Sequence, residues 1–160
     1  MNDMHSDRLS YREINAEDAA LIVKWRSDPE VYKFFTRPCK ITVEEHMNWF
    51  LNSYSSDPNR LDFMALDSDL SRIGVFGIRR ESECSDEAEV SYILAPEFYG
   101  RGFATEGVKW IMDYCKEHWG ISNVLAEIHK ENKSSIHLAE SVGFEETETR
   151  GVFIRYSKRL

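Results

Sequence analysis

A short glycine-rich segment, FYGRGFAT at residues 98–105, contains the residues best suited to bind a charged ligand. Gly100 and Gly102 flank Arg101, and the segment follows the apolar run VSYIL and precedes residues with helical spacing. A helix N-terminus leaves backbone N–H groups without partners, and glycines before it let a ligand approach the backbone closely. This order of strand, glycine turn and helix predicts an anion-binding site, although two isolated glycines can also serve only to turn the chain.

The segment does not fit the two common nucleotide-binding loops. A P-loop ends in Gly-Lys-Ser or Gly-Lys-Thr, and here the first lysine after the glycines is Lys109. A dinucleotide-binding loop opens a parallel β–α–β series, whereas three runs typical of antiparallel strands precede this loop. ATP and NAD are therefore disfavoured as ligands.

The elements that must position this segment alternate between strands and helices. Strands are predicted at 9–14, 61–67, 71–80, 88–94, 123–130 and 151–159, where apolar residues alternate or form short runs. Helices are predicted at 16–28, at 44–54 after a capping box of Thr42 and Glu45, from Phe103 to Gly120, and at 134–144. The three strands between residues 61 and 94 are expected to be antiparallel neighbours. The predicted fold class is α+β, in one domain over residues 1–160.

Composition argues against several kinds of partner. The formal net charge is −8 at pH 7, and a protein that binds nucleic acid or anionic lipid needs a basic face, so neither is expected as a partner. The polar N-terminus and the lack of a long apolar run predict a cytoplasmic protein without a membrane segment. Cys39, Cys84 and Cys115 are odd in number and widely spaced, which indicates reduced structural thiols and no metal site.

Two segments between about residues 87 and 146 carry a family resemblance: AEVSYILAPEFYGRGFATEGVKWIMDYC and NVLAEIHKENKSSIHLAESVGFEE. Together they resemble the GNAT superfamily of acetyl-CoA-dependent N-acetyltransferases. Its loop signature is Gln/Arg-x-x-Gly-x-Gly/Ala, and Tyr99, Gly102 and Ala104 occupy the three defined positions, so the first departs from the pattern. The branch that the chain resembles contains ribosomal-protein N-terminal acetyltransferases and sugar-nucleotide amino-acetyltransferases. The resemblance implies a GNAT fold, a central and mostly antiparallel sheet with helices on both faces.

The resemblance also implies a binding site for acetyl-CoA between two splayed strands. Strand 88–94 would separate from strand 123–130 and leave backbone groups free to pair with the pantetheine arm, those of Ile93, Leu94 and Ala95. The turn and the first helical residues would bind the CoA pyrophosphate: Arg101, Gly102, Phe103, Ala104 and Thr105. Asn132 would hydrogen-bond the pantetheine, and Ser135 would lie near the thioester sulfur. Asn132 is also typical of a helix N-cap, and the two roles are compatible.

Acetyl transfer needs a group that takes a proton from the attacking ammonium and a proton for the departing thiolate. Glu89 is the candidate base, because it matches an AEI glutamate that serves as base in some relatives; a surface glutamate is the alternative interpretation. Strand alternation places Glu89 on the same face as Ser91. Ala139 stands where many family members have a tyrosine that acts as acid, so Ser135 is the candidate replacement and Tyr92 a weaker one.

The N-terminal half is expected to form the acceptor site, with Arg26, Phe34 and Phe35 as candidate lining residues. The expected reaction is direct attack by a primary amine in a ternary complex, because no cysteine lies in a relay motif. The acceptor would be an amino sugar on a nucleotide or the N-terminal amine of a protein. Polyamines, aminoglycosides and a catalytically silent CoA-binding module are the alternatives, and the sequence is compatible with a homodimer.

Overall fold

The structure of this chain, a computed structural model, describes residues 4–160. Its strands are β1 (Ser10–Glu13), β2 (Arg60–Leu66), β3 (Arg72–Arg79), β4 (Glu87–Leu94), β5 (Asn123–His129), β6 (Glu145–Arg150) and β7 (Phe153–Arg159). Its α-helices are α1 (Ala19–Arg26), α2 (Pro29–Tyr32), α3 (Val43–Asn52), α4 (Phe103–Trp119) and α5 (Lys133–Ser141). None of the helices in this part of the chain is long and apolar enough to span a bilayer.

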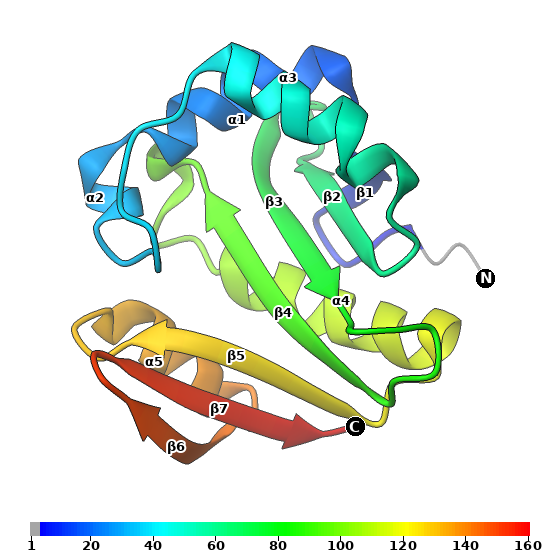
Figure 1. Cartoon of the computed structure of the whole chain (residues 1–160), viewed down its shortest axis with the longest axis vertical. Helices are drawn as coiled ribbons and strands as arrows, with labels where there is room; N and C mark the ends of the chain where they lie inside the picture. The colour runs from blue at the N-terminus through cyan, green and yellow to red at the C-terminus, as the bar shows by residue number, and fades with distance from the viewer. Residues whose placement is uncertain (1–3) are drawn as a thin grey trace.

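The strands form one sheet in the order β1-β2-β3-β4-β5-β7-β6. Neighbouring strands are antiparallel except for β4 and β5, which are parallel and are connected through α4. Figure 1 shows β4 and β5 meeting at one end of the sheet and separating toward the other. The prediction of an α+β fold with a mostly antiparallel sheet is therefore confirmed.

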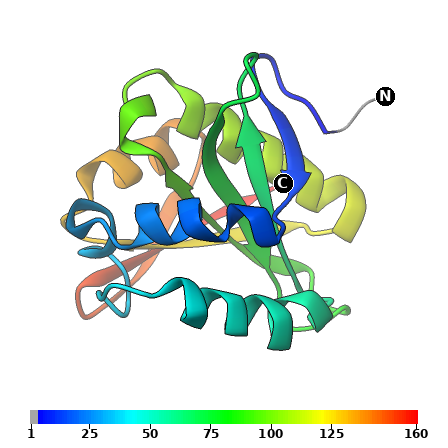
Figure 2. The same cartoon turned by 90° about the horizontal axis from the view of Figure 1, so that it is seen from above.

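Helices cover both faces of the sheet, as Figure 2 shows. On one face, α4 and α5 contribute Val108, Ile111 and Ala139 to a large buried cluster that includes Val90 and Leu94 of β4. The apolar residues of α4 recur at helical spacing, so they all meet the sheet from the same side of the helix. Burial of this face is the main source of the stability of the α4 layer.

A second, smaller cluster lies under α1 and α3 on the opposite face. Ile22 and Trp25 of α1 pack there with Met64 of β2 and Val75 of β3, and all four are buried. Ala95, directly after β4, is fully buried in the same cluster. The two clusters hold α4 and α5 on one face of β4 and α1 and α3 on the other. The end of β4 therefore lies between these two helical layers.

Two predicted helix boundaries are confirmed by their caps. Thr42 Oγ1 accepts a hydrogen bond from the Glu45 N–H, and the Glu45 carboxylate accepts one from the Thr42 N–H, so α3 starts at the predicted capping box. Helix α4 begins at Phe103 and ends at Trp119, followed by its C-cap Gly120, whose φ of 63° is left-handed and favours glycine.

Two elements were missed by the sequence patterns. Strand β6 has the sequence EETETR, and all six of its residues are exposed, so no apolar alternation marks it. It forms by pairing with β7 at the edge of the sheet. Helix α2 begins at Pro29, and the side chain of its N-cap Asp28 accepts from the Glu30 N–H. The sequence predicted one helix that ends at residue 28 and no second helix after it.

Candidate functional site

The separation of β4 from β5 is the feature on which the site is built. The two strands pair only through residues 87–89 of β4 and 123–125 of β5. Beyond these residues β4 continues to pair with β3 as far as Leu94, so its other edge opens toward the gap. An open strand edge presents N–H and C=O groups with which an extended ligand can pair.

Backbone directions along β4 decide which residues face this gap. The Ala95 N–H donates to the carbonyl of Ile73 on the β3 side at 2.8 Å. Alternate residues of an antiparallel strand point these groups to opposite edges, so Ile93 also faces β3, whereas Tyr92 and Leu94 face the gap. This corrects the prediction for Ala95 and Ile93: of the three residues expected to pair with pantetheine, Leu94 alone has backbone groups directed into the gap.

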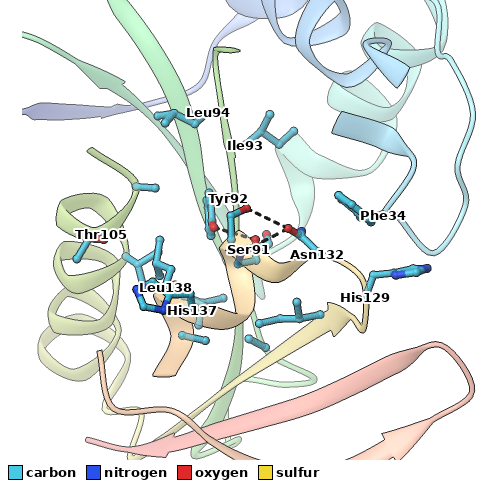
Figure 3. A pocket seen from close by; sticks show the side chains of 18 of the residues that line it. Phe34, Ser91, Tyr92, Ile93, Leu94, Thr105, His129, Asn132, His137 and Leu138 are labelled. Carbon is cyan, nitrogen blue, oxygen red and sulfur yellow. Dashed lines mark hydrogen bonds between the residues drawn. The ribbon is translucent and has the colours of Figure 1, made fainter. Parts of the chain in front are cut away.

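A cavity of about 650 Å³ occupies the gap and extends to the start of α4. Figure 3 shows labelled side chains from β4, α4 and α5 converging on this space. Its wall includes most of the residues that the sequence predicts for CoA: Ile93, Leu94, Gly102, Phe103, Ala104, Thr105, Asn132 and Ser135. The structure thus brings the two sequence segments of the resemblance to one cavity.

The start of α4 is suited to bind an anion. Gly102 precedes the helix with a φ of 78°, and no side chain of the described residues caps the first turn. The N–H groups of residues 103–105 therefore have no intrahelical acceptor, and the helix dipole adds partial positive charge. Arg101 is placed differently, because its exposed guanidinium lies over the Phe98 ring, 5.3 Å from the centroid, and outside the cavity wall.

An arginine near the N-terminus holds this turn in place. Arg8 donates from Nη1 to the Arg101 carbonyl and from Nε to Glu106 in the first turn of α4, both at 2.8 Å. Burial raises the pKa of Glu106, but hydrogen bonds from Ser6 and Arg8 outweigh it and hold that pKa below its usual range. The glycine pattern gives no sign of this contact, because Arg8 and Arg101 are 93 residues apart.

Two hydroxyl groups meet within the cavity. Tyr92 and Ser135 share a hydrogen bond of 2.9 Å, and the side-chain oxygen Oδ1 of Asn132 accepts from the Ser135 N–H as the cap of α5. Burial raises the pKa of Tyr92, and the hydrogen bond with Ser135 opposes this shift only in part. Ala139, in the place of the family's tyrosine, is buried in the cavity wall. The Tyr92 hydroxyl is therefore protonated at neutral pH.

Glu89 lies where this cavity meets a second cavity of about 380 Å³ on the α1/α3 side of the sheet. Its side chain is 37% exposed, and its Oε2 accepts from Arg79 at 3.3 Å. Glu127 of β5 also lines both cavities, but Arg155 binds it more closely, at 2.7 Å. Glu89 is therefore the more available carboxylate at the junction.

The second cavity contains the three residues predicted for the acceptor site. Arg26 ends α1, and Phe34 and Phe35 follow α2. The centroid of the Phe35 ring lies 5.4 Å from the guanidinium carbon of Arg26. The centroids of the Phe34 and His129 rings lie 5.4 Å apart. His46 of α3 also lines this cavity; it was not singled out from the sequence, because a lone histidine on a helix gives no signal of its own.

The cysteines take no part in either cavity wall. Cys39 and Cys84 are exposed and free, and burial raises the pKa of Cys115 to about 12. Within residues 4–160 no group of three or more His, Cys, Asp or Glu side chains is placed to hold a metal ion.

A helix N-terminus beside a splayed strand pair, with a second cavity adjoining it, suits an enzyme that transfers a group from an extended phosphorylated carrier. Residues 8–145 match the family model described as an acetyltransferase (GNAT) domain. The chain therefore belongs to the GNAT family of acetyl-CoA-dependent N-acetyltransferases.

Relatives within this family include proteins of known and unknown substrate. An uncharacterized N-acetyltransferase, p20 of Bacillus licheniformis, is 29% identical over 149 residues, which cover 91% of this chain and 83% of that protein. The spermidine N(1)-acetyltransferase of Escherichia coli K12 is 25% identical over 145 residues, with coverage of 90% and 75%. The crystal structure of a Vibrio cholerae spermidine N-acetyltransferase with CoA and spermine has a TM-score of 0.87, with 20% identity and 96% coverage of both chains. These matches establish the family and the fold and leave the branch and the acceptor open.

Proposed function

We propose that this protein moves an acetyl group from acetyl-CoA, bound between β4 and β5, to a primary amine bound in the second cavity. The observation that carries this proposal is the junction of the two cavities at Glu89 and Ser91, which line both. Because the cavities adjoin, both ligands can be bound at once, which supports direct attack in a ternary complex.

Three parts of this chain fit CoA. The free N–H groups of residues 103–105 are suited to its pyrophosphate, and the backbone groups of Tyr92 and Leu94 are suited to the amides of its pantetheine arm. The Asn132 side chain lies in the same wall. Tyr99, at the signature position where Gln or Arg is usual, is 53% exposed, and the backbone contacts do not depend on it.

The proton transfers can be assigned to named groups. An alkylammonium has a pKa of about 10, so the amine must lose a proton before its lone pair can attack. Glu89 accepts that proton at the junction, the new C–N bond forms as the C–S bond breaks, and the thiolate takes a proton from the Tyr92–Ser135 pair. The nitrogen of the new amide gives up its second proton to solvent, and solvent returns a proton to the pair. A thiolate is a good leaving group, so this last transfer contributes less than the first.

Three classes of acceptor differ in charge. The resemblance implies an amino sugar on a nucleotide, which is anionic, or the N-terminal amine of a protein. Spermidine, which two of the relatives above carry in their names, is a polycation. The charge of the side chains in the second cavity is therefore the property that distinguishes these three classes of acceptor.

The proposed function is tested by CoA binding and by turnover. Calorimetry should show CoA binding, and a thiol reagent should report CoA release from acetyl-CoA when amines of the three acceptor classes are added. Tight CoA binding with no amine-dependent thiol release would instead indicate a silent CoA-binding module.

Gly102→Ala is expected to weaken CoA binding about tenfold, which corresponds to about 1.4 kcal/mol. A left-handed φ costs a residue with a Cβ about 1–2 kcal/mol, and relief of that strain moves the N–H groups that bind the pyrophosphate. Gly120→Ala is the matched control, because Gly120 is also left-handed but lies at the other end of α4. Calorimetry of both variants should show the affinity loss at Gly102 alone; an equal loss in both would assign the effect to general destabilisation.

Ser135→Ala is expected to lower kcat by at most about tenfold. This decrease is smaller than usual for the loss of an acid–base group, because a thiolate is a good leaving group even without a proton donor. The variant removes the hydrogen-bond partner of the Tyr92 hydroxyl. Ser134→Ala is the control for kcat, since Ser134 lies in the same cavity wall but bonds to Asn132 and not to Tyr92. Steady-state kinetics would contradict the assignment if Ser135→Ala kept full kcat while Tyr92→Phe lost activity, and the role would then belong to Tyr92 alone.

A further inference from the structure

The charged side chains of the second cavity are unevenly paired. Its three acidic residues each accept from an arginine: Asp62 from Arg60 at 3.0 Å, Glu89 from Arg79 at 3.3 Å and Glu127 from Arg155 at 2.7 Å. Two further arginines of the cavity wall, Arg26 and Arg37, form no ion pair within residues 4–160. The charge left over in this cavity is therefore positive, although the chain as a whole carries −8.

Two polar atoms in the wall of this cavity lack any partner among the described residues. Arg26 Nε and His46 Nε2 are both buried and make no hydrogen bond. His46 is only 4% exposed, and its ring contacts Trp49 rather than a polar group. A buried polar atom without a partner is unfavourable in a folded protein, so two of them in one cavity wall indicate a partner supplied from outside the chain. The Arg26 Nε–H can only donate, and the His46 ring donates from Nε2 in the tautomer that carries its proton there, so one acceptor group satisfies both.

The local electrostatics agree with this interpretation. Burial lowers the pKa of Arg26 and the charge of Arg60 lowers it further, whereas the Asp62 carboxylate opposes this shift only in part. Burial also lowers the pKa of His46, with a second contribution from Arg26. An anion between these side chains would offset each of these unfavourable contributions.

We propose that Arg26 and His46 bind an anionic group of the acceptor, so that the substrate is a small amine bearing a carboxylate or a phosphate rather than a polyamine. This inference rests on the proposed function, because it assumes that the second cavity holds the amine. Arg26 and His46 line the second cavity alone, whereas Glu89 lines both. The anionic end of the acceptor therefore lies away from the thioester, and its amine lies at the junction.

The same geometry disfavours spermidine. A polyamine needs carboxylates for its several ammonium groups, and every acid in this wall already has an arginine partner. A second ammonium would also lie near Arg26, where like charges repel. The family relationship to spermidine acetyltransferases thus extends to the fold without extending to the acceptor.

Paired acceptors test this directly. Thiol release is measured with lysine against cadaverine, which lacks only the carboxylate, with glucosamine 6-phosphate against glucosamine, and with spermidine. The anionic member of at least one pair is expected to have a kcat/KM at least about tenfold higher, equivalent to one charge-assisted contact. The lysine pair reports a carboxylate and the glucosamine pair a phosphate. A preference for spermidine, or no preference within either pair, would overturn the inference and leave the proposed function standing.

Variants assign the effect to the two side chains. Arg26→Gln and His46→Gln should each remove the preference for the anionic member, mainly through KM. Lys24→Gln, on the exposed side of the same helix as Arg26, should keep it. Because Arg26 lacks an ion pair, its replacement is not expected to unfold α1, and melting temperatures check this. A preference that survives in both variants would also overturn the inference.

A binding measurement keeps the inference testable if no amine in the panel is acetylated, an outcome that counts against the proposed function itself. With CoA present at saturation to block the first cavity, inorganic phosphate should raise the melting temperature of the unaltered protein. Arg26→Gln should abolish that shift, and Lys24→Gln should preserve it. No shift in the unaltered protein, or an equal shift in Arg26→Gln, would show that these residues bind no anion.

Discussion

Glu89→Gln is expected to lower kcat about 100-fold while CoA affinity stays unchanged, because an amide cannot take the proton that the acceptor ammonium must lose. The carboxylate lines both cavities, so it is the group placed to reach an amine that approaches the thioester from the α1/α3 side. Its ion pair with Arg79 is long, at 3.3 Å, and Oε1 makes no hydrogen bond or ion pair within residues 4–160. Steady-state kinetics at saturating acetyl-CoA, with calorimetry of CoA binding alongside, measures both quantities.

The control for this variant is Glu87→Gln on the same strand. Glu87 is exposed, bonds to Asn123 and lines neither cavity, so kcat should not change. The kinetic pattern also separates two roles for Glu89. A loss confined to KM would show that its carboxylate only binds the acceptor, and full retention of kcat would move the proton acceptor to Glu127 or to solvent.

The fold could be predicted from the sequence wherever a local pattern coincides with burial. Helix α4 is marked by apolar residues at helical spacing between Gly102 and Gly120, and α3 by the Thr42 capping box. Strand β6 could not be predicted, because its six exposed residues carry no apolar alternation and form a strand only by pairing with β7. Its existence depends on tertiary context, which a local pattern does not contain.

The candidate site was predictable in its ligand-binding loop and less so in its details. Gly102 and the helix start mark the proposed anion site in the sequence, because backbone geometry follows from residue type there. The prediction that the backbone groups of Ala95 face the gap was wrong, because the edge that they face depends on the register between β3 and β4. Arg8 was missed for a related reason, because its contact with Arg101 joins segments 93 residues apart. His46 was missed because a lone histidine on a helix gives no signal of its own.

Asp18→Asn is expected to lower the free energy of unfolding by about 3 kcal/mol. This value is at the lower end of the range for breaking a buried ion pair, because the partner arginines keep contact with solvent. Asp18 is fully buried directly before α1, the helix that carries Arg26. Its carboxylate accepts from Arg12 at 2.7 and 2.8 Å, from Arg72 at 3.1 Å and from the Asn15 N–H at 2.9 Å. Urea unfolding at pH 7 measures the loss.

The pH dependence gives this prediction a second, independent check. Burial raises the pKa of Asp18, but the bonds from Arg12, Asn15 and Arg72 outweigh it and hold the pKa below its usual value. A group with a lowered folded-state pKa stabilises the fold above its unfolded pKa of about 3.9, and this contribution is lost as the pH falls through the folded value. The difference in the free energy of unfolding between the unaltered protein and Asp18→Asn should therefore become smaller below about pH 4. Exposed Asp69 provides the control, because Asp69→Asn should change stability by less than about 0.5 kcal/mol at either pH. If the difference in the free energy of unfolding stayed constant below pH 4, Asp18 would act by packing and not by charge.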